Sequence, residues 1–384
     1  MLTTDTLIAT PGPTEIPHRV LLALARRPTN PDLDPDFFKR YDEVRVMLAR
    51  MLGTSKGNVV VWVGEAMSGL EAAVANLTVN GNKVAVLSNG VFGDAFADLV
   101  ASYGGVPIIH KVDYGKVLDP DKVKAFLRSE AREAELVTMV HCETPSGTLN
   151  NLKDIAAVVK SEGKLLIVDA VSSMGGTEVN VSWGVDVVIG GSQKVLNLPS
   201  GLTILAVSDE AWERMEKVSY RGFYLNIRLW RDVVERMEFP YTHSEPLING
   251  LLESLRMIEE EGLSNVYARH RAISRGVVNA VEVMGLRLVP ESEEYSSPTV
   301  TAFYTPDGIS ETKVREGAFK YGVLIAGSWG PLKGRVLRIG HMGYTASLNM
   351  MTNAVVALAK ALNDAGYRVK VSDAVEAFLN GVGL

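Results

Sequence analysis

Apolar residues in the first part of the chain follow a repeating pattern. From residue 59 onward, short runs rich in Val, Ile and Leu alternate with segments whose apolar residues recur at helical spacing. The runs cover 59–63, 84–87, 106–110, 136–141, 165–171, 185–191 and 203–207. Buried strands that alternate with amphipathic helices are typical of a mostly parallel sheet with helices on both faces. The pattern therefore predicts an α/β fold.

The pattern changes after about residue 245. The segment 246–262 has apolar residues at helical spacing and ends at a glycine, which suits the end of a helix. Further helices are expected up to about 284, near 311–321 and after 341, and strands are expected at 299–304, 323–327 and 335–341. We therefore expect two domains. The N-terminal segment and large domain would cover 1–255, and a smaller α+β domain would cover 256–384.

Composition narrows the classes of protein that fit. The 384 residues carry a net charge of −6 and contain no long basic block, so we expect no nucleic-acid partner. Cys142 is the only cysteine, which excludes an intrachain disulfide and a cysteine-based zinc site, and we expect no metal. The uncharged stretch within 339–359 is too polar for a membrane span, and the N-terminus does not look like a signal peptide. We expect a cytoplasmic protein without membrane partners.

Polar side chains follow four of the expected strands. They lie at 64–69, at 143–147, at Asp169 and in the segment 190–194, which ends at Lys194. In open parallel sheets, ligands bind beyond the carboxyl ends of the strands. We therefore expect all four segments to meet at one edge of the sheet and to form a cleft there.

Two charged residues of this cleft indicate a cofactor. On its own, an aspartate at a strand end is usually a cap or turn residue, and a loop lysine usually lies on the surface. Asp169 and Lys194 are separated by 25 residues (194 − 169), which is enough for a turn, a crossover segment and a strand. Pyridoxal phosphate needs a lysine for a Schiff base and an acid that keeps its ring nitrogen protonated. The start of a helix near 64–69 could bind the phosphate.

Eight motifs occur in this order along the chain: PGPTEIP (11–17), SGLEAAVANL (68–77), SNGVFGD (88–94), HCETPSGTLN (141–150), LLIVDAVSSMGG (165–176), GGSQKVLNLPSGL (190–202), YTHSEP (241–246) and RIGHMG (338–343). Together they resemble the class V aminotransferases of the fold-type I pyridoxal phosphate family. The resemblance is greatest to the alanine–glyoxylate and serine–pyruvate (serine–glyoxylate) branch. It implies the fold of that family, pyridoxal 5′-phosphate as the cofactor, amino acid and 2-oxo acid substrates, and a homodimer with shared active sites.

The resemblance also implies roles for individual residues. Lys194 would form the Schiff base, and Asp169 would pair with the ring nitrogen. Further cofactor contacts would come from Glu65, Ala66, Met67, Phe92, Thr144, Val171 and Gln193, and from Tyr241 and Ser244 of the neighbouring subunit. Arg338 would bind the α-carboxylate of the substrate, for which the planar guanidinium is suited.

Three features depart from the family pattern or compete with it. Glu65 places an acid where a small or hydroxyl residue usually faces the phosphate, so we expect its side chain to turn outward. The segment 26–38 lacks a His-Arg pair that relatives often carry, which affects substrate preference. His141 and Cys142 are interpreted as the end of a buried strand rather than as catalytic groups.

The function implied by the resemblance is transfer of an amino group from serine or alanine to glyoxylate or pyruvate by a ping-pong Schiff-base mechanism. Other class V activities stay open, namely a 2-aminoethylphosphonate or ureidoglycine aminotransferase. A cysteine desulfurase or other lyase fits less well, because the single cysteine is not expected on a mobile loop. A catalytically inactive scaffold of the same fold is a further alternative, against which the joint presence of Lys194, Asp169 and Arg338 argues.

Overall fold

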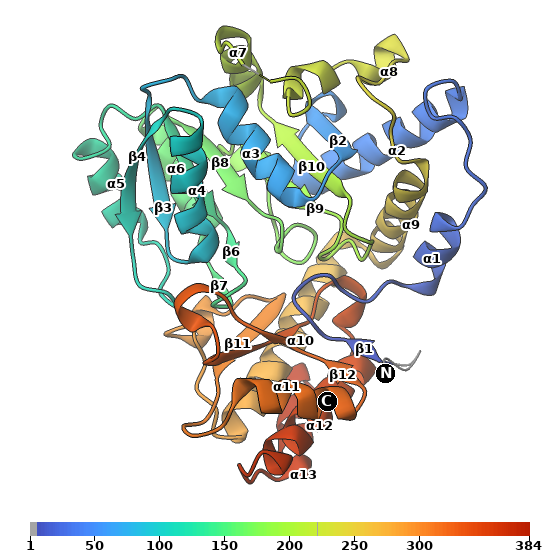
Figure 1. The fold of residues 1–384 in the computed structure, drawn as a ribbon, viewed down its shortest axis with the longest axis vertical. Coiled ribbons are helices and arrows are strands. Elements are labelled where there is room, and N and C mark those ends of the chain that lie inside the picture. The colour runs from blue at the N-terminus through green and yellow to red at the C-terminus, as the bar shows by residue number, and fades with distance from the viewer. Residues whose placement is uncertain (1–5, 221) are drawn as a thin grey trace.

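The computed structural model describes residues 6–220 and 222–384. Its larger part is built on a seven-stranded sheet with the order β2-β10-β9-β8-β5-β3-β4 (Figure 1). These strands are β2 (Val59–Val63), β3 (Lys83–Ser88), β4 (Val106–Lys111), β5 (Leu136–Val140), β8 (Leu165–Asp169), β9 (Val187–Gly191) and β10 (Leu202–Val207). β10 runs antiparallel to both of its neighbours, and the other pairs are parallel. The expected α/β fold with a mostly parallel sheet is confirmed.

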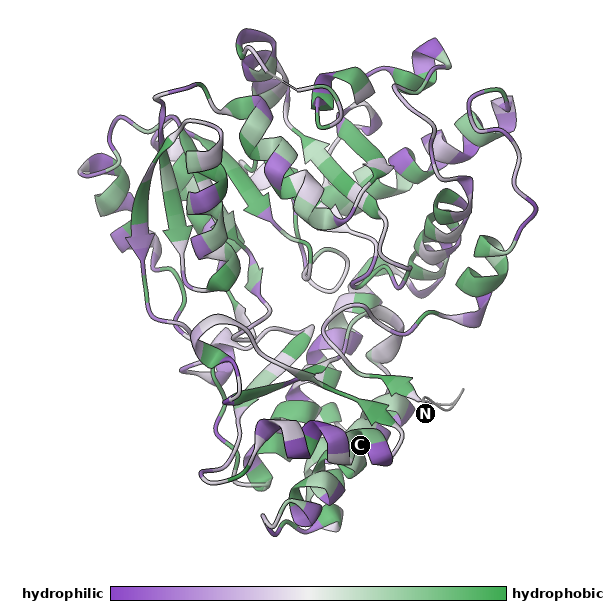
Figure 2. Ribbon diagram, in the orientation of Figure 1, coloured by the Kyte–Doolittle hydropathy of each residue, from purple (hydrophilic) through white to green (hydrophobic). Residues whose placement is uncertain are grey.

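Helices surround this sheet and pack on it or on one another. They are α1 (His18–Leu24), α2 (Pro35–Leu52), α3 (Ala66–Leu77), α4 (Val91–Ser102), α5 (Pro120–Arg128), α6 (Leu152–Ser161), α7 (Asp209–Lys217) and α8 (Val233–Arg236). Local sequence sets their ends: Asp119 caps α5 by accepting hydrogen bonds from two backbone N–H groups, and Pro120 is the first helical residue. Figure 2 shows the strands of the sheet as mostly hydrophobic, with hydrophilic residues on the outer helices. The sheet therefore lies within the apolar core.

The C-terminal part contains a three-stranded sheet and most of the remaining long helices. The sheet has the order β11-β14-β13. Its strands are β11 (Val300–Tyr304), β14 (Val336–Gly340) and β13 (Ala326–Gly327), and the helices are α10 (Leu263–Val283), α11 (Glu311–Lys320), α12 (Leu348–Asp364) and α13 (Val371–Val382). Helix α9 (Glu245–Glu261) packs against α1 and α2 and contributes to the core of the larger part. The single strand expected over 323–327 is divided into β12 (Val323–Leu324) and β13, because the two short segments pair with different partners.

The beginning of the described chain packs with the C-terminal part. β1 (Leu7–Ile8) pairs in parallel with β12, and Ala9 belongs to the same buried cluster as the side chains from Ile273 to Phe378. The sequence-based division assigns these first residues to the large domain, whereas their contacts in the structure are with the C-terminal part. The other buried cluster extends from Val20 to Leu255. A boundary after residue 255 stays a proposal.

A short hairpin lies near the end of the large sheet. β6 (Cys142–Glu143) and β7 (Thr148–Leu149) form a small antiparallel hairpin beyond the end of β5. Among residues 6–220 and 222–384, no helix has both the length and the apolar character needed to cross a membrane.

Candidate active site

A cavity of about 440 Å³ lies beyond the carboxyl ends of the parallel strands. All four polar segments identified in the sequence contribute to it. Its lining includes Gly12, Pro13, Glu65, Ala66, Met67, Phe92, Cys142, Thr144, Asp169, Val171, Gln193, Lys194 and Trp329. The segments that follow β2, β5, β8 and β9 meet here because parallel strands end at the same edge of a sheet, whereas Gly12, Pro13 and Trp329 come from outside this sheet.

Lys194 follows β9 and is partly buried. Its Nζ donates a 2.6 Å hydrogen bond to the carbonyl oxygen of Pro11. Burial and the nearby positive charge of Arg338 lower the pKa of Lys194 to about 8, and Asp169 acts in the opposite direction. Gly12 permits the close contact, because a Cβ at its φ of +111° would lie 2.5 Å from Nζ. The amine is therefore neutral in a useful fraction of molecules near neutral pH.

Asp169 is the last residue of β8, and its side chain is buried. Its Oδ1 accepts a 2.9 Å hydrogen bond from the backbone N–H of Val171. Burial raises the pKa of Asp169 to about 6, although this hydrogen bond and the charge of Lys194 both favour the ionised form. At neutral pH the carboxylate is mainly ionised and can accept a hydrogen bond from a protonated ring nitrogen.

Phe92 lies at the start of α4 and lines the cavity, as do Val171 and Thr144. The backbone N–H groups of Phe92 and Gly93 donate to the carboxyl group of Glu143, at 3.2 and 2.6 Å. Glu143 is fully buried, and burial raises its pKa to about 8. This carboxyl group occupies the N-terminus of α4 and so fixes the position of the aromatic ring.

Glu65 does not turn outward as expected. Its Oε2 accepts a 2.8 Å hydrogen bond from Met67 N, and its Oε1 accepts a 2.6 Å hydrogen bond from Gln193 Nε2. The carboxylate therefore caps the N-terminus of α3 and points to the place where a phosphate would bind. The expectation is wrong because the N–H groups and dipole of a helix N-terminus attract a carboxylate as strongly as they attract other anions.

Arg338 lies on β14 and is buried behind Trp329, and it is not part of the cavity lining. Its Nε donates a 2.7 Å hydrogen bond to the carbonyl oxygen of Gly327. Its Cζ lies 5.5 Å from the centre of the Trp329 ring. Burial lowers the pKa of Arg338 to about 10, which leaves it charged at neutral pH. Within residues 6–220 and 222–384 this guanidinium forms no ion pair with a carboxylate, and a buried cation of this kind is suited to bind an anion.

Tyr241 and Ser244 do not line the cavity of their own chain. Tyr241 stacks on Tyr224 with ring centres 4.3 Å apart, and its hydroxyl donates to the Tyr224 carbonyl oxygen. Ser244 immediately precedes α9. Any contact of these two residues with the cofactor would therefore have to be made in another subunit.

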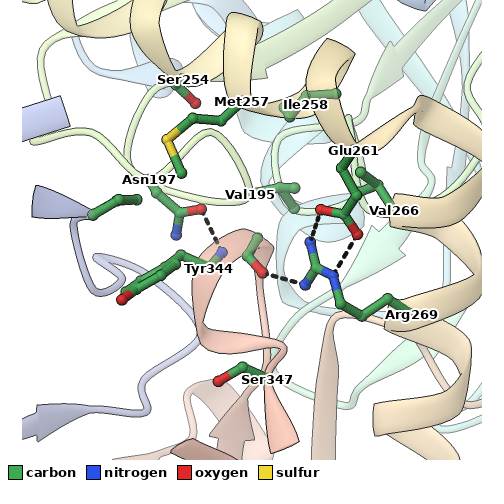
Figure 3. Close-up of a pocket in the computed structure, with 12 residues that line it drawn as sticks. Val195, Asn197, Ser254, Met257, Ile258, Glu261, Val266, Arg269, Tyr344 and Ser347 are labelled. Carbon is green, nitrogen blue, oxygen red and sulfur yellow. Dashed lines mark hydrogen bonds and ion pairs between the residues drawn. The ribbon is translucent and has the colours of Figure 1, made fainter. Parts of the chain in front are cut away.

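A smaller cavity of about 240 Å³ lies behind the loop that follows Lys194, next to α9 and α10 (Figure 3). Its main polar groups bind each other: Arg269 donates to both carboxylate oxygens of Glu261 and to the Gly343 carbonyl oxygen. Asn197 Oδ1 accepts from the backbone N–H of Tyr344 at 2.7 Å. These contacts support the lysine loop from behind and leave the chemistry to the larger cavity.

Comparisons with known proteins agree with this geometry. The family model described as aminotransferase class-V matches residues 10–325. A pyridoxamine–pyruvate transaminase of Mesorhizobium japonicum is 36% identical, with 96% of this chain and 95% of that protein covered. A serine–glyoxylate aminotransferase of Methylorubrum extorquens is 32% identical, with 96% and 93% covered. The crystal structure of a pyridoxamine–pyruvate aminotransferase from Mesorhizobium loti superposes with a TM-score of 0.95 at 34% identity, covering 99% of this chain and 97% of that one.

The chain belongs to the class V aminotransferases. It is a pyridoxal-phosphate-dependent transaminase with the type I fold of its structural relatives. The cavity fits the ring of this cofactor, because it offers a lysine amine, a buried carboxylate and apolar side chains. At the phosphate end, the donors are Gln193 Nε2 and Met67 N, and both now donate to the Glu65 carboxylate. Here a phosphate can bind to the N-terminus of α3 once the Glu65 carboxylate leaves Met67 N.

Three contributors to this class V site were not identified from the sequence. Glu143 lies within the motif HCETPSGTLN, but the sequence of this loop-like segment does not indicate that the glutamate contacts α4. Gly12 also lies in a quoted motif, and its φ of +111° is visible only in the structure. Trp329 stands in a loop between short strands, where no periodic pattern marks it. The role of each of these residues depends on contacts with segments that are distant in the sequence.

Proposed function

We propose that the chain transfers an amino group from serine or alanine to glyoxylate or pyruvate by a ping-pong mechanism. The observation that carries the proposal is that Lys194 and Asp169 line one cavity, while Arg338 is buried behind Trp329, another residue of its lining. A lysine amine, an acid for the ring nitrogen and a cation for a carboxylate are the groups that transamination of an amino acid requires. The names of the serine–glyoxylate relatives support a small 2-oxo acid as the acceptor.

The residues of the chain have separate tasks in this reaction. Bound pyridoxal phosphate supplies an electron sink that weakens the bond between Cα and its hydrogen. Lys194 Nζ would take this proton from Cα and deliver it to the C4′ carbon of the cofactor, which its lowered pKa of about 8 permits near neutral pH. Asp169 keeps the ring nitrogen protonated, while Phe92 and Val171 exclude water from the ring.

Arg338 would hold the carboxylate shared by amino acid and 2-oxo acid substrates. Its guanidinium keeps its charge at neutral pH in spite of burial, and its Nε is fixed by Gly327. The remaining guanidinium nitrogens can then form paired hydrogen bonds with a carboxylate. The same guanidinium could bind a phosphonate, so 2-aminoethylphosphonate is one of the amino donors to be tested.

A second candidate for the amino donor is pyridoxamine. One observation favours it: Glu65 already occupies the α3 N-terminus, where its negative charge would repel a phosphate dianion. A ring without a phosphate would meet no such repulsion. A relative with 36% identity is named for pyridoxamine and pyruvate. In this second proposal, pyridoxamine binds in the same cavity as a substrate and gives its amino group to pyruvate, and the product formed from its ring then leaves.

Desulfurase chemistry is disfavoured by the position of Cys142. The thiol lies in the short strand β6 and donates a hydrogen bond to Ser297 Oγ at 3.1 Å. Burial raises the pKa of the Cys142 thiol, which keeps it protonated and unreactive. A thiol fixed in a buried hairpin cannot move to a substrate sulfur.

The amino donor can be identified by measuring alanine formation from pyruvate. Purified protein is supplied either with pyridoxal phosphate and serine, ureidoglycine or 2-aminoethylphosphonate, or with pyridoxamine alone. Alanine–glyoxylate exchange is followed as glycine formation. Turnover with serine or alanine supports the first proposal, and turnover with pyridoxamine and no added phosphate ester supports the second. If none of these donors is used, the proposed function is wrong.

The role of Glu65 is tested by Glu65→Ser with Glu65→Gln as its control. Removing the negative charge should tighten pyridoxal phosphate binding by about tenfold or more, since one unit charge is removed from beside a dianion. Both variants should show the effect, because both remove the charge. Binding is measured by fluorescence titration. Unchanged affinity in both variants would show that the Glu65 carboxylate does not oppose the phosphate.

We also propose a homodimer with shared sites. Tyr241 and Ser244 lie away from the cavity of their own chain, and they match family residues that reach the phosphate of the neighbouring subunit. Pairing of two chains would allow these side chains to complete the partner's site.

A further inference from the structure

Trp329 is an unusually exposed aromatic residue at the wall of the active-site cavity. Its side chain is 53% exposed and lines the cavity together with Phe92 and Lys194. Its ring packs edge-on against Phe92, with the ring centres 5.7 Å apart. On its other side it contacts the guanidinium of Arg338. The indole therefore contacts both an aromatic residue of the cavity lining and the guanidinium of Arg338.

The backbone on both sides of Trp329 is held in place. Ser328 is buried, and its hydroxyl donates a 2.7 Å hydrogen bond to the Pro145 carbonyl oxygen, beside Thr144. On the other side, the carbonyl oxygen of Trp329 accepts a hydrogen bond from Leu332 N. The large ring thus projects into the cavity from a fixed support. A large apolar side chain with this exposure contributes little to the core, and its position at the cavity is suited to contact with a ligand.

The position of Trp329 limits the shape of a substrate. A 2-oxo acid must place its carboxylate at Arg338 and its keto carbon near Lys194, so its remaining substituent lies close to the aromatic pair of Phe92 and Trp329. We expect a methyl group or a hydrogen to fit beside these rings and a branched side chain to meet the indole. Pockets of this kind discriminate by size when they cannot expand.

We propose that Trp329 is the specificity-determining residue that restricts this enzyme to small 2-oxo acids. The inference rests on the proposed function for the identity of the acceptor. It assigns the discrimination between pyruvate and larger acids to one side chain, while Arg338 supplies the carboxylate contact that all such acids share.

The test compares kcat/KM for pyruvate with kcat/KM for 2-oxo-4-methylpentanoate. Trp329→Ala should shift the ratio towards the larger acid by about tenfold or more, in line with the usual effect of pocket size on specificity. Trp329→Phe keeps an aromatic wall and should shift the ratio much less. Tyr321→Ala is the matched control, because it removes a 41% exposed aromatic ring outside the cavity lining. A ratio in Trp329→Ala within about twofold of wild type overturns the proposal.

A binding measurement separates this inference from the proposed function. Propionate has a carboxylate but no keto or amino group, so it can bind at Arg338 without reacting. Titration with propionate should change the tryptophan fluorescence of the wild type, and Trp329→Phe should lose most of that change. If the wild type turns over no 2-oxo acid, the proposed function is wrong, and the role of Trp329 in ligand contact is then decided by the titration alone. The absence of a change in the wild type, or an equal change in Trp329→Phe, overturns the role of Trp329.

Discussion

Two side chains have ionisation equilibria that the fold shifts towards neutral pH. Burial raises the pKa of Asp169 to about 6 and lowers the pKa of Lys194 to about 8. Each charge stabilises the other, but desolvation is the larger effect on both. Such paired shifts are typical of groups that bind or move protons. Functional side chains of this kind reduce the stability of the protein when no ligand is bound.

Replacement of Asp169 by asparagine should stabilise the ligand-free protein at about pH 8. The folded-state pKa of about 6 lies above the unfolded value of about 3.9, so the ionised carboxylate destabilises the fold above about pH 6. This penalty shrinks as the pH falls from about 6 towards about 4 and disappears below about pH 3, where both states are protonated. We expect a gain of about 1–3 kcal/mol at about pH 8. Urea unfolding at about pH 8 and about pH 4.5 measures it, and an equal gain at both would exclude ionisation as the cause.

Individual strands position Asp169 and Lys194 at the cavity, and helix N-termini and the N-terminal segment form parts of its wall. The ends of β8 and β9 bring Asp169 and Lys194 to the same edge of the sheet, as the alternating pattern predicts. The N-termini of α3 and α4 both bind carboxyl groups of the chain itself, from Glu65 and Glu143. Residues 9–15, which we call the N-terminal strap, cross the cavity. The strap is fixed at its beginning by the pairing of the preceding strand β1 with β12, and at its end by hydrogen bonds from Asn197.

Gly12→Ala should displace the N-terminal strap. The new Cβ would lie 2.5 Å from Lys194 Nζ, at a φ that L side chains rarely adopt. We expect a loss of activity of about a hundredfold or more, since small misplacements of catalytic groups have effects of this size. The control is Gly163→Ala, which has a φ of +67° but no atom within 4 Å of the new Cβ. Steady-state kinetics and thermal unfolding of both variants measure the effect, and equal loss of activity in both would exclude a specific contact with Lys194.

On the scale of the whole molecule, the site lies where the two parts of the chain meet. Lys194 and Asp169 belong to the large sheet, whereas Arg338 and Trp329 come from the C-terminal part. Tyr241 and Ser244 contribute nothing to the cavity of their own chain. The proposed dimer would bring a third source of residues to each site.

Mixing two inactive variants tests the proposed sharing of sites. Lys194→Ala lacks the catalytic amine, and Tyr241→Ala would lack a contact that reaches the partner's cofactor. In a mixed dimer one site carries both changes and the other carries neither, so activity should return at about half of the wild-type value per dimer. Co-expression followed by separation of the mixed species by tag supplies the sample. Without recovery, Tyr241 does not act across a dimer interface.

The sequence by itself determined the sheet, because period-two and period-3.6 patterns of apolar residues follow from the geometry of strands and helices. It also placed Asp169 and Lys194 together, since parallel strands end at one edge. The pairing of β1 with β12 was not predicted, because it depends on a partner far away in the chain. The helices α1 and α2 were not predicted either, although Asp34, Pro35 and Gly53 mark the ends of α2 locally.

Tertiary structure decided what surrounds the lysine and what restricts the ligand. The contact of Gly12 with Lys194, the capping of α3 by Glu65 and the position of Trp329 before Arg338 all join segments that are distant in sequence. Local pattern describes which face of an element is apolar, but it does not describe which side chains from different elements meet. Those meetings set the pKa values of the site and the space left for a substrate, because both depend on packing in three dimensions.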